Sequence, residues 1–309
     1  MSVQQEIRRL KNREIDYAKW DDCIQNAANS RVYAASWFLD RTATEWDALV
    51  WGDYEFVMPL PYRKKLGISY LYQPLYCQQL GIFPKPPADI AMEFFDTITR
   101  NYSYFDIQLN ASNLPPKNFR EIQPLPRKNF LLRLGTDYEV IYSGYSTNTK
   151  RNLAKASKNN LGLLPGISLE EYMKFKAANL SVKLSAGKLK NLRQLIAFGQ
   201  HKGFGRIYGV YSPANELCAA VYFCRFKERV IYMNAVSDEQ GKKLGAMPFL
   251  IDNFIRENAD KNLTIDFEGS MIPGVARFYE GFGASPETYY RIRSKRLPFP
   301  IKLLRYIKS

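Results

Sequence analysis

The chain has 309 residues, of which 44 are Lys or Arg, 30 are Asp or Glu and one is His. Hydrophobic residues make up 46% of the chain, enough for packed cores, which excludes a disordered or low-complexity protein. The single histidine, His201, excludes most zinc sites and any Ser-His or Cys-His nucleophile that does not use it, so no metal site is expected. The length suggests two domains of ordinary size.

The net charge of +14 is unevenly distributed along the chain. Residues 140–212 contain twelve basic and two acidic residues, and residues 291–309 contain seven basic residues and no acidic one. Such concentrations can attract a phosphate-bearing ligand, although solvated helix faces would also account for them. The C-terminal tail mixes apolar and basic residues, so it could contact an anionic membrane surface.

The N-terminus and the cysteines bear on the compartment. Charged residues stand where a secretory signal needs an apolar run, and the uncharged stretch 66–84 contains Gln and Pro, which makes it a poor transmembrane helix. The four cysteines form no CxxC pair and are expected to be reduced thiols. A cytoplasmic protein is therefore expected.

Hydrophobic periodicity predicts the elements of the first half in chain order. Helices are predicted at 16–28, 34–42 and 87–100, a β-hairpin at 45–60 that turns at Gly52-Asp53, and further strands at 69–78, 104–110 and 129–134.

The second half repeats this order of elements. Helices are predicted at 146–158, 169–180, 188–202, 243–258 and 273–281, and strands at 205–211, 216–225, 229–236, 263–268 and 287–293. Asp106 and Asp266 stand in similar strand sequences 160 residues apart, which favours an internal duplication, the alternative being a coincidence of common patterns. The sequence predicts an α/β fold with mixed sheets and two domains, 1–143 and 144–309.

A motif near the end of the chain carries a family resemblance. Residues 273–284, PGVARFYEGFGA, are similar to the late helix of the GNAT acyltransferases, in which an aromatic-Tyr pair is followed four residues later by Gly. The family usually has Asn where this chain has Ile272. In that family the Tyr commonly protonates the departing thiolate, so the resemblance implies this role for Tyr279. An amphipathic helix with a core tyrosine is the alternative.

Two GNAT-like halves joined by a basic helix resemble the FemABX-like group and its acetyltransferase relatives. The best matches are the Asn148-x-Lys150-Arg151-Asn152 segment and the closing segment 266–284. The resemblance implies two tandem GNAT-like domains and transfer of an acyl or aminoacyl group to an amine, with acyl-CoA or aminoacyl-tRNA as donor. The long helical arm of FemA proteins has no counterpart, because 183–201 is too short.

Acyl transfer to an amine needs a base for the amine proton, a polarised carbonyl and an acid for the leaving group. Glu268, at the end of the predicted strand 263–268, could relay the amine proton, and Tyr279 could return one. Asp266 and Glu268 would share one strand face, so a solvent-facing pair is the alternative.

A CoA donor would need backbone N–H groups at a helix N-terminus to hold its pyrophosphate. GNAT enzymes provide them with Arg/Gln-x-x-Gly-x-Gly/Ala, and the corresponding stretch here has a different spacing. The residues of that stretch expected to bind the donor are Gly241, Lys242, Lys243, Gly245 and Ala246. Acyl-CoA is thus one possible donor, and no tightly bound cofactor is expected.

The basic helix 146–158 is the predicted substrate site. Arg151, Lys155 and Lys158 fall on one helix face, which favours the phosphate of an anionic small molecule, a lipid-linked substrate or tRNA. The residues expected in the cleft are Asn148, Lys150, Arg151, Asn152 and Lys155, joined by Tyr72 and Gln73 from the first half. Ordinary sheet positions are the alternative for Tyr72 and Gln73.

The sequence therefore predicts an N-acyltransferase acting on an amine of a phosphate-bearing acceptor. A non-catalytic RNA- or nucleotide-binding protein on a degenerate GNAT scaffold is the alternative, weakened because no RRM, KH or zinc-knuckle motif is visible. A peripheral membrane protein anchored by its tail is a third hypothesis.

Overall fold

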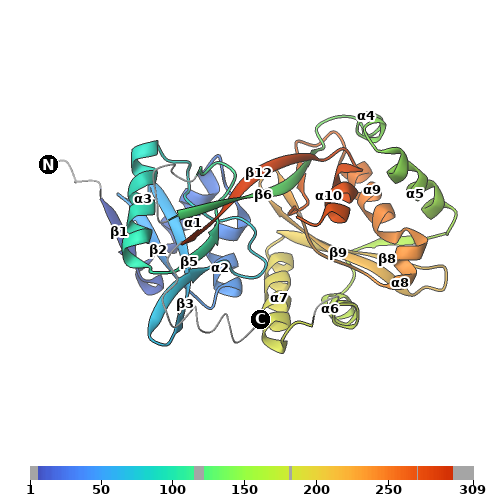
Figure 1. Cartoon of the computed structure of the whole chain (residues 1–309). Helices are drawn as coiled ribbons and strands as arrows, with labels where there is room; N and C mark the ends of the chain where they lie inside the picture. The colour runs from blue at the N-terminus through green and yellow to red at the C-terminus, as the bar shows by residue number, and fades with distance from the viewer. Residues whose placement is uncertain (1–5, 115–121, 181–182, 270, 295–309) are drawn as a thin grey trace. The chain divides into compact units, whose positions relative to one another are not determined.

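The structure is a computed structural model that describes residues 6–114, 122–180, 183–269 and 271–294. The described residues form two compact units, the first within residues 6–127 and 288–294 and the second within residues 128–287. Each unit is a sheet with helices packed on it (Figure 1). The C-terminal tail, predicted to contact a membrane, lies outside the described residues.

The sheet of the first unit is antiparallel except for one parallel pair, β4 with β5. Its strands, in spatial order, are β1 (Ile7–Leu10), β2 (Glu45–Trp51), β3 (Phe56–Lys65), β4 (Ile68–Tyr72), β5 (Phe105–Gln108) and β12 (Ser285–Ser294). Its helices are α1 (Tyr17–Asn26), α2 (Ser36–Thr42) and α3 (Ala88–Asn101). Asp16 caps α1 by accepting from two backbone N–H groups, and α3 buries Phe94, Phe95 and Ile98 in the core.

The sheet of the second unit has one parallel pair, β10 with β11, among antiparallel ones. Its strands, in spatial order, are β6 (Ile122–Arg133, from Lys128 on in this unit), β11 (Thr264–Asp266), β10 (Arg229–Ser237), β9 (Leu217–Phe226), β8 (Gly205–Tyr211) and β7 (Gly162–Pro165). Its helices are α4 (Tyr138–Ser143), α5 (Thr147–Ser157), α6 (Leu169–Ala178), α7 (Ala186–His201), α8 (Glu239–Leu244), α9 (Ala246–Asn258) and α10 (Pro273–Glu280).

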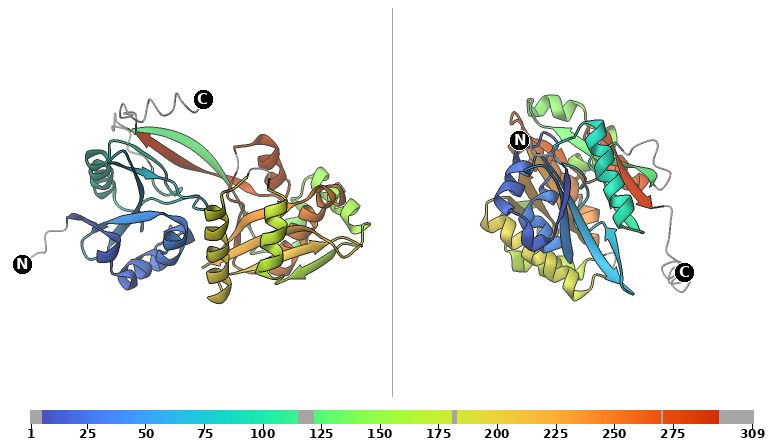
Figure 2. Two further views of the ribbon diagram at one scale, coloured as in Figure 1. Left: turned by 90° about the horizontal axis from the view of Figure 1, so that it is seen from below. Right: turned by 90° about the vertical axis from the view of Figure 1, so that its left-hand side faces the viewer.

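The helices of the second unit cover both faces of its sheet. α6 and α7 lie on one face, and α5, α9 and α10 lie on the other (Figures 1 and 2). α9 is held to the sheet by aromatic packing, with the rings of Phe223 and Phe254 stacked at a centroid distance of 3.7 Å. The sheet core therefore positions both α10 and the end of β11.

Taken from the outer edge, the strand order is β1-β2-β3-β4-β5-β12 in the first unit and β7-β8-β9-β10-β11-β6 in the second, so the two units have the same order. Each unit takes its last strand from the other half of the sequence. In the first unit Ile292 of β12 pairs with Ile107 of β5, and in the second unit Leu132 of β6 pairs with Ile265 of β11. The compact units consequently differ from the predicted domains 1–143 and 144–309, because β6 and β12 cross between units. A boundary between sequence repeats carries no information about which strands are exchanged.

Most predicted elements are present within a few residues of their expected bounds, but four differ. The strand predicted at 129–134 begins seven residues earlier, at Ile122. The helix predicted at 243–258 is two helices, because Gly245 between them has a left-handed φ of +76°. The strand predicted at 263–268 ends at Asp266, since Glu268 has φ +57°. The strand predicted at 69–78 ends at Tyr72.

Three short elements, β1, β7 and α4, have no counterpart among the predictions. They span only four to six residues each, which is too short for a periodic pattern to stand out. Within the described ranges, no helix is both long and apolar enough to cross a bilayer.

Candidate active site

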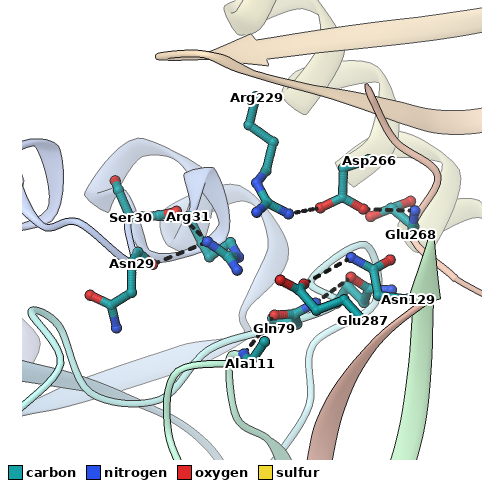
Figure 3. A network of polar contacts seen from close by, with 11 residues as sticks. Asn29, Ser30, Arg31, Gln79, Ala111, Asn129, Arg229, Asp266, Glu268 and Glu287 are labelled. Atoms are coloured by element: carbon teal, nitrogen blue, oxygen red, sulfur yellow. Dashed lines mark hydrogen bonds and ion pairs between the residues drawn. The ribbon is translucent and has the colours of Figure 1, made fainter. Parts of the chain in front are cut away.

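The end of β11 is shaped by a buried carboxylate. Asp266 is fully buried, and its Oδ2 accepts a hydrogen bond from Nη1 of Arg229 at 2.5 Å. Its Oδ1 accepts one from the backbone N–H of Glu268 at 2.9 Å. Figure 3 shows this line of contacts from Arg229 through Asp266 to Glu268. Asp266 thus joins β10 to the turn that follows β11 and fixes the backbone of Glu268.

That turn has an unusual backbone. Glu268 and Gly269 both have left-handed conformations, with φ values of +57° and +58°. A Cβ at Gly269 would overlap the carbonyl oxygen of Lys128 in β6, so only glycine fits. Such a conformation at a non-glycine residue costs free energy and is concentrated at functional sites. The turn therefore holds Glu268 away from the face it would occupy in a continued strand, which corrects the prediction that Glu268 and Asp266 share a strand face.

Tyr279 lies on α10 and faces the sheet. Its ring stacks on Phe267 at a centroid distance of 4.7 Å, with Tyr232 and Phe130 each 6.1 Å away. Burial and, more weakly, the Glu268 carboxylate raise the pKa of Tyr279 well above its ordinary value, so the phenol keeps its proton at neutral pH. Tyr279 thus packs on the residue that precedes Glu268, the other residue predicted to be catalytic.

A cavity of about 690 Å³ lies between the N-terminus of α5 and α10. It is lined by Ser146, Asn148, Thr149, Asn152, Pro248, Gly274, Arg277, Phe278, Glu280, Gly281 and Phe282. Two of the predicted substrate residues, Asn148 and Asn152, are in this wall. The wall also contains the cation Arg277. Its position within the motif 273–284 was the only sequence feature that could have pointed to a place in the site.

The three basic residues predicted for the cleft lie elsewhere on α5. Lys150 donates to the carbonyl oxygen of Ser143 at 3.1 Å, and Arg151 donates to Oδ1 of Asn148 at 2.7 Å. Lys155 is exposed. Of these, Arg151 acts on the cavity indirectly, by orienting the Asn148 amide.

The first half of the stretch predicted to hold CoA is helical. Gly241, Lys242 and Lys243 lie within α8, where the Asp238 carboxylate already accepts from the Gly241 N–H at 2.6 Å. A Cβ at Gly241 would overlap the carbonyl oxygen of Cys218, so this glycine serves the packing of α8 on β9.

The second half of that stretch packs against α5. A Cβ at Gly245 would lie 3.3 Å from the Cβ of Ala156, and the Leu244 carbonyl accepts from Nδ2 of Asn159 at 3.0 Å. Ala246 begins α9, whose third residue, Pro248, has no N–H to offer. The role of residues 241–246 in donor binding stays a prediction.

The predicted residues of the first unit bond to its own backbone. The Tyr72 hydroxyl accepts from the Thr44 N–H at 2.9 Å, and Oε1 of Gln73 accepts from the Gln108 N–H at 2.8 Å. Gln79 likewise accepts from the Ala111 N–H at 3.1 Å, as Figure 3 shows. Tyr72 is the last residue of β4 and Gln73 follows it, and a place for either in a substrate cleft stays a prediction.

A buried lysine escaped the sequence analysis. Lys176 on α6 is 6% exposed, and its Nζ donates to the Asn234 carbonyl at 3.1 Å, which also accepts from the Tyr172 hydroxyl at 2.7 Å. Asn234, with φ +55°, lies in a bulge of β10 between Met233 and Val236. Burial lowers the pKa of Lys176 to about 8. In the sequence it looked like one more residue of a basic surface.

Comparison with solved structures identifies the fold. FemX superimposes with a TM-score of 0.62 at 9% identity, over 98% of this chain and 100% of FemX. The chain has the FemABX-like GNAT fold. L-PGS from Bacillus licheniformis matches this fold with a TM-score of 0.53 at 7% identity, over 85% of this chain and 88% of that one.

A third match to the FemABX-like GNAT fold is the C-terminal domain of an Agrobacterium fabrum protein described as a lysylphosphatidylglycerol synthetase. It has a TM-score of 0.54 at 8% identity, over 94% of this chain and 95% of that one. No protein-family model matches the sequence, and neither does any curated protein sequence.

Proposed function

We propose that the chain is an N-acyltransferase whose active site lies in the second unit, at the end of β11 and on α10. The observation that carries the proposal is the stacking of the partly buried Tyr279 phenol on Phe267, the residue that precedes Glu268, on a GNAT scaffold. A carboxylate can accept the proton of an attacking amine, and a phenol that holds its proton can donate it to a leaving group.

The reaction then follows from these two groups. The amine nitrogen of the acceptor forms a bond to the acyl carbonyl carbon and loses a proton to Glu268. The tetrahedral intermediate collapses as the bond to the donor's sulfur or oxygen breaks, and that atom takes the proton of Tyr279. Proton exchange with solvent returns Glu268 and Tyr279 to their starting states. The stacked ring of Phe267 fixes the direction of the Tyr279 hydroxyl.

The acceptor is proposed to carry a phosphate. The cavity beside α10 combines Arg277, opposed by Glu280 in the same wall, with the N-terminus of α5, where helix amides and the helix dipole favour an anion. One structural neighbour is described as a lysylphosphatidylglycerol synthetase, and this description supports a phosphate-bearing or lipid-linked acceptor.

The donor is proposed to be an aminoacyl-tRNA rather than acyl-CoA. The Asp238 carboxylate occupies the N-terminus of α8, where a CoA pyrophosphate would otherwise bind, and Glu239 adds a second negative charge in the first turn. Asp238 repels a pyrophosphate, whereas the Glu239 charge is paired with Lys242 at 2.5 Å. Binding measurements with CoA, acetyl-CoA and charged tRNA decide between the donors, and failure of all three to bind at micromolar concentration would contradict the proposal.

The test of the site compares Tyr279→Phe and Glu268→Gln with Tyr208→Phe, a buried tyrosine of the same unit that bonds Glu257. Both site variants should lower kcat roughly 100-fold with unchanged folding, since general acid–base groups contribute about 10²–10⁴-fold. Tyr208→Phe should keep the wild-type rate. Wild-type turnover in both site variants would exclude the assigned roles.

A second function is favoured by one observation, the exposure of Arg151, Lys155 and Lys158 on α5. Such a stripe can bind an RNA backbone without any catalysis. In that case RNA binding would persist in both site variants, and no acyl transfer would be measured with the wild-type protein.

A further inference from the structure

The end of the β3–β4 hairpin extends beyond the sheet of the first unit. The pairing of β2 with β3 ends at Tyr62, and the pairing of β4 with β5 begins at Leu71. Within the described part of the chain, residues 63–70 therefore pair only with each other. At about 3.3 Å per residue this two-stranded ribbon extends roughly 10 Å past the sheet. Figures 1 and 2 show the β3 hairpin running out from the rest of its unit.

The turn at the tip carries an unexpected residue. Lys65 pairs with Ile68, and the two residues between them, Leu66 and Gly67, have φ values of +50° and +75°. Two positive φ values are those of a type I′ turn, for which Asn-Gly is the favoured pair. Leucine is disfavoured in this conformation, and the Leu66 side chain is 72% exposed. A residue that breaks a local rule and exposes apolar surface points to a function of the tip.

The strand that leads to the tip is positively charged. Arg63, Lys64 and Lys65 are exposed, and residues 56–72 contain no acidic side chain. The Arg63 guanidinium lies 4.1 Å from the ring centroid of Tyr72, and the Lys64 ammonium lies 5.9 Å from that of Tyr62. Long basic side chains beside an apolar tip can hold their charges at a polar boundary while the tip enters an apolar layer.

We propose that the end of the β3–β4 hairpin docks on an anionic lipid bilayer, with Leu66 inserted below the headgroups and Arg63, Lys64 and Lys65 on their phosphates. The combination of three cations and a solvent-exposed leucine decides for a bilayer, since RNA would use the cations and leave Leu66 without a role. The proposal is independent of acyl transfer.

The experiment is sedimentation of the full chain with vesicles of phosphatidylcholine containing about 30% phosphatidylglycerol, and with vesicles of phosphatidylcholine alone. Leu66→Asn is the decisive variant, because Asn-Gly suits the turn and keeps the hairpin folded. It should lower partitioning roughly tenfold. Changing Arg63, Lys64 and Lys65 to Glu should lower it roughly 100-fold, and the wild-type protein should prefer the anionic vesicles.

The matched control changes three exposed lysines of the second unit, Lys174, Lys190 and Lys202, to Glu, which alters the net charge equally. It should keep partitioning within about threefold of wild type. The proposal is overturned if the wild-type protein does not sediment with anionic vesicles, if Leu66→Asn partitions like wild type, or if the control loses as much as the hairpin variant. Binding to RNA that depends on the three cations but not on Leu66 would assign the hairpin to RNA instead.

Discussion

The partners of buried charged side chains differ between the two units. In the first unit two carboxylates, Asp47 and Asp106, have side chains that are 2% and 15% exposed. Their partners are Arg9 and Lys11 for Asp47, and Arg291 and Arg293 for Asp106. Each carboxylate is thus held by two cations and links neighbouring strands, β2 to β1 and β5 to β12. These pairs are part of the scaffold.

In the second unit two buried charges are tied to irregular backbone, whereas the buried Asp252 lies in the regular helix α9 and pairs with Tyr138 and Arg256. Asp266 pairs with Arg229 and fixes the turn at Glu268, and Lys176 donates to the carbonyl of Asn234 in a bulge. Among the described residues Lys176 has no carboxylate partner. Keeping such groups out of water is costly, and sites that retain them at strained backbone are candidates for function. β5 and β11 occupy equivalent places in the two sheets, but their aspartates have different roles. Asp106 links β5 to β12, whereas Asp266 fixes the turn at Glu268.

The largest difference is expected between Asp266→Ala and Asp106→Ala. Removing Asp266 leaves Arg229 largely buried without this partner and the Glu268 N–H without its acceptor, so the free energy of unfolding should fall by about 3–5 kcal/mol. Asp106 is more exposed, and its loss should cost about half as much. Urea unfolding of both variants measures this. Equal decreases in the free energy of unfolding would show that the two carboxylates contribute equally to stability.

The strained turn after β11 provides the next comparison. Gly269→Ala forces a Cβ against the Lys128 carbonyl in a left-handed conformation and should lower the free energy of unfolding by about 2 kcal/mol or more. Gly274→Ala, in open space in the first turn of α10, is the control and should change it by less than about 1 kcal/mol. A stable Gly269→Ala protein would contradict the tight approach of this turn to β6.

The smallest effect concerns Lys176 and appears as a pH dependence. Its pKa is about 8 in the folded chain and 10.5 when unperturbed, so between these values the unfolded state binds the extra proton. The free energy of unfolding must then rise with pH in that window. From pH 8 to about 9.5, wild type should gain about 1–2 kcal/mol relative to Lys176→Met. Parallel pH profiles would mean that Lys176 is solvated.

Local sequence signals predicted a helix or strand well where residues adjacent in the chain determine its start and end. Asp16 and Ser146 are side-chain caps of α1 and α5, and both helices begin within a residue of the expected position. The break at Gly245 and the turn at Glu268 escaped prediction because their backbone conformations depend on packing against α5 and β6. A glycine within a helical pattern does not reveal that an opposing helix requires it.

The candidate site was predicted in part. The motif 273–284 and the end of β11 singled out Tyr279 and Glu268. In the structure Tyr279 stacks on Phe267, the residue before Glu268, and the catalytic roles of both stay a prediction. Arg277 was overlooked inside the same motif. Lys176 was counted with the surface lysines because nothing in its neighbouring residues distinguishes a buried ammonium from a solvated one.

The sequence by itself determined the order of most helices and strands and the uneven placement of charge, and its resemblance to the GNAT enzymes singled out Tyr279. These follow from periodicity and motifs that span a few residues to a few tens of residues. The tertiary structure decided which strands are exchanged between the halves, which charges are buried and which basic residues stay exposed at the tip of a hairpin. Those outcomes depend on contacts between distant positions, such as Ile107 with Ile292 and Leu132 with Ile265, whose partners no local pattern encodes.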